Sequence, residues 1–251
     1  MNLLFQIPRP VIFAHRGASA YAPENTIASF NLAKKLGARA VELDVKLTLD
    51  GKVVVIHDPN TLRTTGQNRW VNQTNFSELS KLDAGSFFSD QFLDERIPLL
   101  EEVIDCLGSE ILINIELTNY NSPNDSLVEK TVAIVVRKGV QENVLFSSFA
   151  PINLLKARGL LPEVPVGILA AEGREGWWTR SLIGRWFFPG MIHPHLGDVT
   201  RGFIQREHNR NRRVHVWTVN RKEDMKKLIE LKVDGIFTDE LALAKQTLED
   251  G

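Results

Sequence analysis

Short apolar runs rich in β-forming residues alternate with helical patterns along nearly the whole chain of 251 residues. Nine runs are predicted to be strands: 11–14, 40–48, 53–57, 111–118, 143–149, 164–169, 191–193, 214–219 and 235–238. Between them, residues 26–36 and 223–231 repeat apolar side chains at helical spacing. Strands joined by helices pair in parallel, so this length favours an α/β fold, a (β/α)8 TIM barrel, over an open doubly wound sheet.

Two of the nine runs are too close together for a parallel connection. The runs 40–48 and 53–57 are separated by four residues, LDGK, which suits a hairpin. One of them is therefore predicted to be an antiparallel arm, which leaves eight strands for the barrel. A turn near Asp50 and Gly51 would pair residues whose numbers sum to about 101, so Asp44 is expected to face His57.

Residues 59–98 lack sustained periodicity and are rich in polar and turn residues. A connection of this length is commonly a functional insertion. We expect residues 1–251 to form a single, slightly irregular barrel domain, with one segment inserted at about 59–98. It would lie between the third strand and the following helix, above one face of the barrel.

Composition excludes several classes of protein. The formal net charge of −1 lacks the basic excess of nucleic-acid binders, so no nucleic-acid partner is expected. Cys106 is the only cysteine, which rules out an intrachain disulfide and does not favour a thiolate metal site. The apolar stretch 3–7 is too short for a signal peptide, and no apolar run reaches 18 residues. We expect a cytoplasmic protein, and the sequence does not indicate its oligomeric state.

The polar motifs of interest fall at or near strand ends. They are HRG at 15–17, ELD at 42–44, HD at 57–58 and NIEL at 114–117. The carboxyl ends of barrel strands gather on one rim, where such enzymes place their chemistry. Motifs that are separate in sequence are therefore expected to meet in space.

Three acids in these motifs form a candidate metal site. Glu42 and Asp44 are two residues apart on a strand and so point to the same face, where Glu116 could join them. Three inward carboxylates repel one another unless a cation neutralises them. Oxygen ligands favour one divalent cation, Mg²⁺ or Ca²⁺, over zinc.

His15 and His57 are the acid–base candidates, because imidazole titrates near neutral pH. Either histidine alone is more often a structural residue. Arg16 adds a permanent charge that suits phosphate oxygens. Together with a metal ion, these groups describe a site for a phosphodiester.

Seven stretches carry a family resemblance, in order from about residue 11 to residue 239. They are AHRGASAYAPENTIASF, VELDVKLTLDGKVVVIHD, ERIPLLEEVI, INIEL, LFSSF, VWTVN and DGIFTD. Any one of them is weak, but the ordered set is specific. In this set the chain resembles the glycerophosphodiester phosphodiesterase family.

The resemblance implies a TIM barrel with an inserted segment that hydrolyses glycerophosphodiesters to glycerol 3-phosphate and an alcohol. By position, it implies that His15 accepts a proton, His57 donates one and Arg16 binds phosphate. It also implies three metal ligands: Glu42, Asp44 and Glu116. In such enzymes the glycerol 2-hydroxyl attacks phosphorus, and water then opens the cyclic phosphate.

Two further residues are candidates for substrate binding. The family motif has a lysine two positions after the glutamate, whereas this chain reads IELTNY, with Thr118 there. Thr118 would donate a weaker hydrogen bond, or the head group of the substrate differs. Trp217 would line the glycerol or alcohol side of the pocket, or else pack in the core. Glu24, in the PENT turn, is expected to hold Arg16 or a histidine.

The stretch 172–190 combines aromatic and basic residues. Its aromatic side chains lie among arginines: Trp177, Trp178, Trp186, Phe187 and Phe188 among Arg174, Arg180 and Arg185. Such a composition suits peripheral contact with a membrane or a lysolipid through residues 174–190. The alternative is an outer helix, ended by Pro189 and Gly190, that packs its aromatics inward and leaves its arginines in water. His193 and His195 are expected to order a loop, outside the site.

Three functions follow from these patterns. The first is a metal-dependent phosphodiesterase acting on small glycerophosphodiesters. The second, suggested by the aromatic stretch and Thr118, is a lysophospholipase D type hydrolase acting at a membrane surface. The third is a non-catalytic barrel that binds phosphodiesters.

Overall fold

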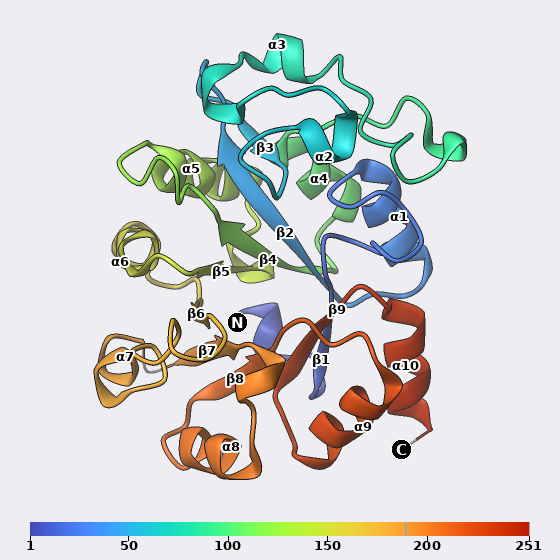
Figure 1. Ribbon diagram of the computed structural model, residues 1–251. Coiled ribbons are helices and arrows are strands. Elements are labelled where there is room, and N and C mark those ends of the chain that lie inside the picture. The colour runs from blue at the N-terminus through green and yellow to red at the C-terminus, as the bar shows by residue number, and fades with distance from the viewer. Residues whose placement is uncertain (189, 251) are drawn as a thin grey trace.

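In the computed structural model, which describes residues 1–188 and 190–250, eight parallel strands close on themselves. Closure occurs because β1 (Val11–Ala14) pairs with both β2 (Ala40–Leu47) and β9 (Gly235–Thr238). The remaining strands follow in chain order around the barrel (Figure 1): β4 (Leu112–Leu117), β5 (Val144–Ser148), β6 (Val166–Ala170), β7 (Met191–Pro194) and β8 (Arg213–Val216). The predicted TIM barrel is confirmed.

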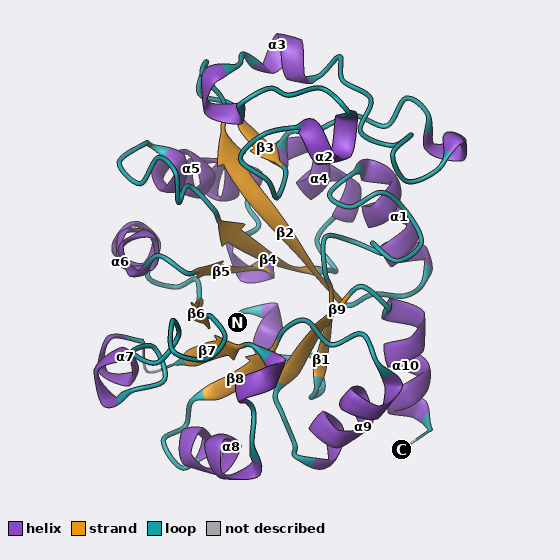
Figure 2. Cartoon of the chain, viewed as in Figure 1, coloured by secondary structure: helices purple, strands orange, loops and turns teal. Residues whose placement is uncertain are grey.

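Helices surround the strands, as Figure 2 shows. The longer ones connect successive barrel strands or follow the last: α1 (Ile27–Lys35), α4 (Leu100–Leu107), α5 (Leu127–Lys138), α6 (Pro151–Leu160), α7 (Leu182–Phe187), α8 (Arg201–His208), α9 (Lys222–Glu230) and α10 (Leu241–Glu249). Helix α1 begins where the Thr26 hydroxyl accepts a hydrogen bond from the Ser29 N–H. The prediction that Pro189 ends an outer helix falls on a residue outside the described ones.

The strand β3 (Val53–Val55) pairs antiparallel with β2, which confirms the predicted hairpin. Thr48 and Lys52 pair through their backbones, so the loop has three residues and Gly51 takes a left-handed conformation (φ 72°). Paired residue numbers therefore sum to 100, as in Val45 with Val55. The expectation that Asp44 faces His57 is wrong by one residue, since the carbonyl of Asp44 accepts a hydrogen bond from Ile56.

The inserted segment runs from β3 to α4 and lies over the β2–β3 hairpin (Figure 1). It contains four short helical turns: α2 (Leu62–Thr65), η2 (Val71–Gln73), α3 (Phe76–Leu79) and η3 (Asp90–Phe92). Its buried residues, among them Val71, Leu79 and Ile97, form an apolar cluster with Val54 and Ile56 of the hairpin arm. This apolar cluster, separate from the barrel core, attaches the inserted segment to the hairpin arm.

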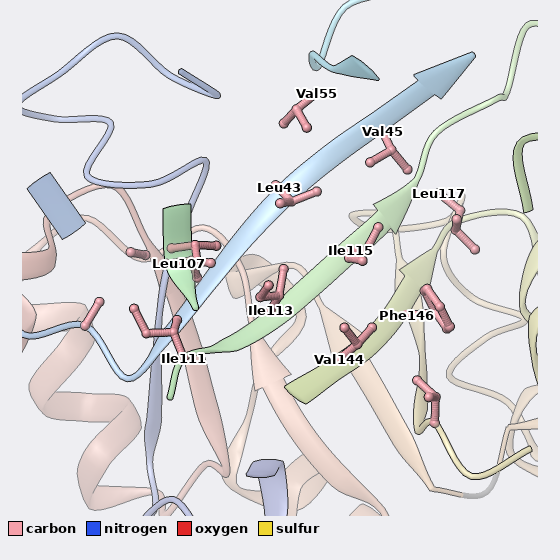
Figure 3. Close-up of a cluster of buried hydrophobic side chains, with 14 of the residues drawn as sticks. Leu43, Val45, Val55, Leu107, Ile111, Ile113, Ile115, Leu117, Val144 and Phe146 are labelled. Atoms are coloured by element: carbon pink, nitrogen blue, oxygen red, sulfur yellow. The ribbon is translucent and has the colours of Figure 1, made fainter. Parts of the chain in front are cut away.

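Side chains of β2 and β4 alternate between two environments, and this alternation orients the site. Leu43 and Val45 of β2 pack with Ile113 and Ile115 of β4 in the core between strands and helices (Figure 3). The residues between them point to the barrel interior. Even-numbered positions of both strands are therefore the ones that can carry chemistry.

The amino-terminal end of the barrel is closed by the chain's own start. The short turn η1 (Leu3–Phe5) places fully buried Leu4 against Val11, Leu112 and Met191, at the beginnings of three strands. Figure 1 shows the N-terminus near the barrel axis. The opposite end is the one available for ligands. Two more 3-10 turns, η4 (Gln141–Asn143) and η5 (Leu196–Asp198), complete the described elements. None of the described helices is long and apolar enough to cross a membrane.

Candidate active site

Three carboxylates meet at the open end of the barrel. Asp44 of β2 pairs in register with Glu116 of β4, and Glu42 lies two residues before Asp44 on the same face. One oxygen from each of the three acids lies within 4.8 Å of the others. Glu42 and Asp44 are only 2% and 1% exposed. The predicted cluster is brought together by the pairing of two neighbouring strands.

The charges of this cluster are strongly coupled. Burial, together with the charges of Asp44 and Glu116, raises the pKa of Glu42 well above its usual range. Burial and Asp44 raise the pKa of Glu116 to about 8. Burial would also raise the pKa of Asp44, but Arg16 and His57 bring it below its usual value. The cluster thus holds more acid groups than its surroundings can keep ionised.

The donor set fits a hard divalent cation. All three groups offer carboxylate oxygens, which Mg²⁺ and Ca²⁺ prefer. Buried Oε1 of Glu42 has no hydrogen-bond partner in the part of the chain that the structure describes. An unpaired buried carboxylate oxygen beside two further carboxylates fits the ligand set of such a cation.

Arg16 sits in a tight turn directly after β1. Its backbone N–H donates to Oε2 of Glu42 at 3.0 Å, and its Nε lies 3.4 Å from Oδ2 of Asp44. Nη1 donates to Glu24 at 3.0 Å, which confirms the prediction for Glu24. The turn needs Gly17 (φ 83°), because a Cβ there would lie 2.4 Å from Oγ of Ser29.

His15 is held by an aspartate from the far end of the chain. Nδ1 of His15 lies 2.7 Å from Oδ1 of Asp239, and Nε2 lies 3.9 Å from Oε2 of Glu42. Burial alone would raise the pKa of Asp239, but its hydrogen bonds, led by that with His15, lower it to about 2. An ionised Asp239 accepts a hydrogen bond from Nδ1–H of His15, which leaves Nε2 as the nitrogen that can accept a proton.

His57 is held in the same way by its neighbour. Nδ1 of His57 lies 2.7 Å from Oδ1 of Asp58, and Nε of Arg63 donates to the other oxygen at 2.7 Å. Despite partial burial, the hydrogen bonds from Arg63 and His57 lower the pKa of Asp58 to about 2. Arg63 also binds Glu24, which links this pair to Arg16 through one carboxylate.

Most of the predicted site residues line one cavity of about 100 Å³. Its polar walls include five of the predicted residues: His15, Arg16, Glu42, His57 and Glu116. Trp217, Phe149, Leu169 and Phe237 supply an apolar side. The cavity therefore presents acids, a guanidinium and two imidazoles opposite apolar rings.

The remaining predicted residues lie close by. Buried Asp44 accepts a hydrogen bond from Asn25 at 2.9 Å. Trp217 follows β8 and donates from Nε1 to the carbonyl of His193 at 2.7 Å, while its edge meets Phe149. Thr118 lines an adjoining cavity, and its hydroxyl donates to the carbonyl of Val45 at 2.8 Å. That hydroxyl is thus already engaged within the sheet.

Sequence reasoning did not assign three residues that contact the site. Asp58 and Asp239 lie within quoted motifs, HD and DGIFTD, but their role as histidine partners was not predicted. Tyr120, whose hydroxyl donates to Oε1 of Glu116 at 2.9 Å, follows NIEL by three residues. An acid next to a histidine was a signal for Asp58, whereas Asp239 is brought to His15 only by the pairing of β1 with β9.

The aromatic side chains of residues 174–190 do not all pack inward, as the alternative of an outer helix requires. Phe188 is buried and Trp178 packs partly against the core, but Trp177 and Trp186 are 63% and 78% exposed. Two of the three arginines are held by polar contacts: Arg180 binds Asp198 at 2.8 Å, and Nε of Arg185 donates to the carbonyl of Ser181 at 3.3 Å. Arg174 is exposed. Leu182 and Ile183 add to an exposed apolar surface on α7.

The prediction that His193 and His195 order a loop holds for one of them. Nδ1 of His195 accepts a hydrogen bond from the Gly197 N–H and so caps η5. For His193 the prediction is wrong, because its side chain points from β7 into the barrel and stacks on His215, with ring centroids 5.0 Å apart.

Comparisons with known proteins point to one family. A model of the glycerophosphoryl diester phosphodiesterase family matches residues 15–243. A glycerophosphodiester phosphodiesterase of Caldanaerobacter subterraneus subsp. tengcongensis is 36% identical over 233 residues, covering 92% of this chain and 95% of that protein.

Solved structures agree with the sequence comparison. A phosphodiesterase of Oleispira antarctica, in complex with the product sn-glycerol-3-phosphate, has a TM-score of 0.84 and 31% identity, covering 96% of this chain and 97% of that one. A glycerophosphodiester phosphodiesterase of Agrobacterium tumefaciens has a TM-score of 0.80 and 28% identity, covering 94% and 98%. The similarity in sequence and in fold thus extends over most of the chain.

Proposed function

Because this chain belongs to the glycerophosphoryl diester phosphodiesterase family, we propose that it hydrolyses glycerophosphodiesters to glycerol 3-phosphate and an alcohol. One observation carries the proposal: two histidines, each held by an aspartate, face the same cavity as Arg16 and the acidic cluster. That constellation provides a base, an acid and cationic phosphate binding. A similar barrel that was solved with sn-glycerol-3-phosphate supports the choice of product.

The two histidines divide the proton transfers. Nε2 of His15 takes the proton of the glycerol 2-hydroxyl, whose oxygen then attacks phosphorus, and Asp239 stabilises the imidazolium formed. His57 gives a proton to the departing alkoxide, so the P–O bond to the alcohol breaks without release of a strong base. Water then opens the cyclic phosphate, with the proton transfers reversed, and glycerol 3-phosphate is formed.

Glu42, Asp44 and Glu116 would hold one divalent cation, Mg²⁺ or Ca²⁺. Such a cation, when bound, supplies a Lewis acid that neutralises charge on the phosphoryl oxygens. Arg16 contributes a fixed charge beside it, oriented by Glu24. Trp217 and Phe149 form the apolar side on which the glycerol carbons can pack.

A coupled assay for glycerol 3-phosphate release tests the proposal. We expect release from soluble glycerophosphodiesters with Mg²⁺ or Ca²⁺, loss of release with EDTA, and a decrease of about 10²–10⁴-fold in His15→Ala. His208→Gln, which changes a histidine on α8 outside the cavity, serves as the matched control. If no glycerol 3-phosphate is released from any diester with either metal, but a diester binds saturably, the non-catalytic barrel would be favoured.

The exposed apolar surface of α7 supports a second candidate, hydrolysis of lysophospholipids at a membrane surface. Trp177 lies on the loop that follows β6, and that loop leaves the barrel at the same rim as the site. Exposed Trp177 and Trp186, with Leu182 and Ile183, suit insertion at a lipid interface.

A paired variant separates the two candidates. On lysophosphatidylcholine in phosphatidylglycerol vesicles, Trp186→Ala is expected to lower the release of choline and lysophosphatidate about fivefold or more, but not to alter hydrolysis of soluble diesters. Val136→Ala, an exposed apolar position on α5, is the control. Activity confined to soluble diesters, with no vesicle binding, would reject this candidate.

A further inference from the structure

A second cavity, of about 330 Å³, opens beside the catalytic one. Its walls come from the end of β2, from the inserted segment and from the loop after β4. Trp70, Tyr120 and Phe149 give it flat aromatic surfaces, while Asn72 and Asn121 give it amide groups. The cavity is therefore large enough, and polar enough, for a small hydroxylated group.

The two cavities have lining residues in common, and these lie where the P–O bond of a substrate would be broken. His57, Glu116 and Phe149 line both of them. His15, Arg16 and Trp217 line only the smaller cavity. In an in-line displacement the attacking and departing oxygens lie on opposite sides of phosphorus, so a departing group that His57 protonates lies on the His57 side, away from His15. That side is the larger cavity.

Lys46 provides a positive charge in the larger cavity. It follows Glu42 and Asp44 on the inward face of β2 and does not line the smaller cavity. Its Nζ donates to the carbonyl and to the hydroxyl of Thr118, both at 2.8 Å. An ammonium has three N–H donors, so one stays available for a ligand.

The ammonium of Lys46 has no carboxylate in direct contact, although carboxylates further away act on its charge: Asp44, Glu116, Asp58 and Asp125. Its hydrogen bonds go to neutral oxygens of Thr118, and it forms no ion pair with a carboxylate of residues 1–188 or 190–250. In a partly enclosed cavity, an ammonium without a carboxylate in contact repels a second cation that comes close to it and donates to hydroxyl oxygens. Aromatic walls alone would also accept a quaternary ammonium, but the ammonium of Lys46 opposes it.

We propose that the larger cavity binds the leaving alcohol, and that Lys46 selects polyhydroxy alcohols, such as glycerol or inositol, against quaternary ammonium alcohols, such as choline. The inference rests on the proposed function and names the substrate class of the same site. The free N–H of Lys46 donates to an alcohol hydroxyl, and the aromatic surfaces pack against the C–H groups of the polyol.

Substrate preference tests the inference. We expect kcat/KM of the native chain to be about tenfold or more higher for glycerophosphoglycerol and glycerophosphoinositol than for glycerophosphocholine. Lys46→Met keeps the length of the side chain but removes the charge, so the preference should fall to about threefold or less. Lys46→Arg keeps the charge and should retain the preference.

Two controls make each outcome decisive. Lys52→Met removes a charge from an exposed lysine on the same hairpin and should leave the preference unchanged. Trp70→Ala, on the inserted segment, should weaken kcat/KM for the polyol esters even if Lys46→Met fails to fold. Equal kcat/KM for the three substrates in the native chain, or an unchanged preference in Lys46→Met, would overturn the assignment. Failure to hydrolyse any of them would reject the proposed function and this inference with it.

Discussion

Nδ1 of His15 lies 2.7 Å from Oδ1 of Asp239, although 224 positions separate these residues in the chain. The pairing of β1 with β9 brings them together, and Ser19 and Asn220 hold the carboxylate from two further sides. A carboxylate at Nδ1 fixes the tautomer in which Nε2 accepts a proton, which is the form that a general base requires.

Asp239→Asn should therefore lower kcat by about 10²-fold or more, with a smaller change in KM, because an amide no longer fixes that tautomer. Steady-state kinetics on a soluble glycerophosphodiester measure it. Asp224→Asn, in the first turn of α9, is the matched control and should keep native kcat. Native kcat in Asp239→Asn would show that the contact only positions the loop.

The role of His57 predicts a dependence on the leaving group. His57→Ala should slow hydrolysis of an alkyl diester about 10²–10⁴-fold, because an alkoxide leaves poorly without a proton. On glycerophospho-p-nitrophenol the same variant should lose less than about tenfold, since p-nitrophenolate leaves without protonation. Equal losses on both substrates would assign His57 to binding instead of proton donation.

The order of the elements could be predicted from the sequence because periodicity is local. The strands 11–14 and 235–238 match β1 and β9 at both ends, and the four-residue LDGK link predicted the hairpin. The register was wrong by one residue, since it depends on the pairing of Thr48 with Lys52 in the loop. Residues 53–56 (VVVI) are apolar at every position, so their pattern does not show which face is inward and leaves the register open.

The site was predictable where its residues share a strand or a motif, as Glu42 and Asp44 do. Partners that depend on the closure of the barrel were missed, such as Asp239 for His15. The inward direction of His193 was missed too, because a run of only three residues does not show which face is buried. Long-range contacts require the folded topology.

Removal of one carboxylate from the cluster should separate metal binding from folding. In EDTA, Glu42→Gln should be at least as stable as the native chain, because burial and the charge of Asp44 disfavour the ionised carboxylate that the neutral amide replaces. With Mg²⁺ or Ca²⁺ at about 100 times Kd, the native chain should gain about 2.7 kcal/mol and the variant little. Thermal unfolding measures both, with Glu110→Gln as an exposed control. An equal gain in the variant would place the cation elsewhere.

The core around β4 should be sensitive to truncation. Ile113 is fully buried between β4 and the helices, so Ile113→Ala should cost about 2–5 kcal/mol of unfolding free energy through lost contacts and a cavity. Ile152→Ala on α6, where the side chain is half exposed, should cost much less. Urea unfolding compares the two variants, and similar losses would contradict the packing described for β4.

Two stacked histidines inside the barrel predict a loss of stability in acid. His193 and His215 are fully buried, and none of their ring nitrogens has a hydrogen-bond partner within the described residues. Burial, with the charge of Arg212, lowers the pKa of His193 to about 3, and burial lowers that of His215 well below its usual value. In the unfolded chain both rings titrate near about 6.5.

The sign follows from proton linkage. Below about pH 6.5 these histidines bind protons in the unfolded chain but stay neutral in the folded barrel. The free energy of unfolding therefore falls as the pH decreases. The contribution of His193 levels off only near pH 3. Between about pH 7 and about pH 4.5, His193→Leu should gain on the order of 2 kcal/mol relative to the native chain, because it removes one of these groups. Urea unfolding at both pH values measures this difference, and Ile152→Ala, which removes no titrating group, should show none. Parallel losses of stability in His193→Leu and in the native chain would mean that His193 takes up its proton without unfolding.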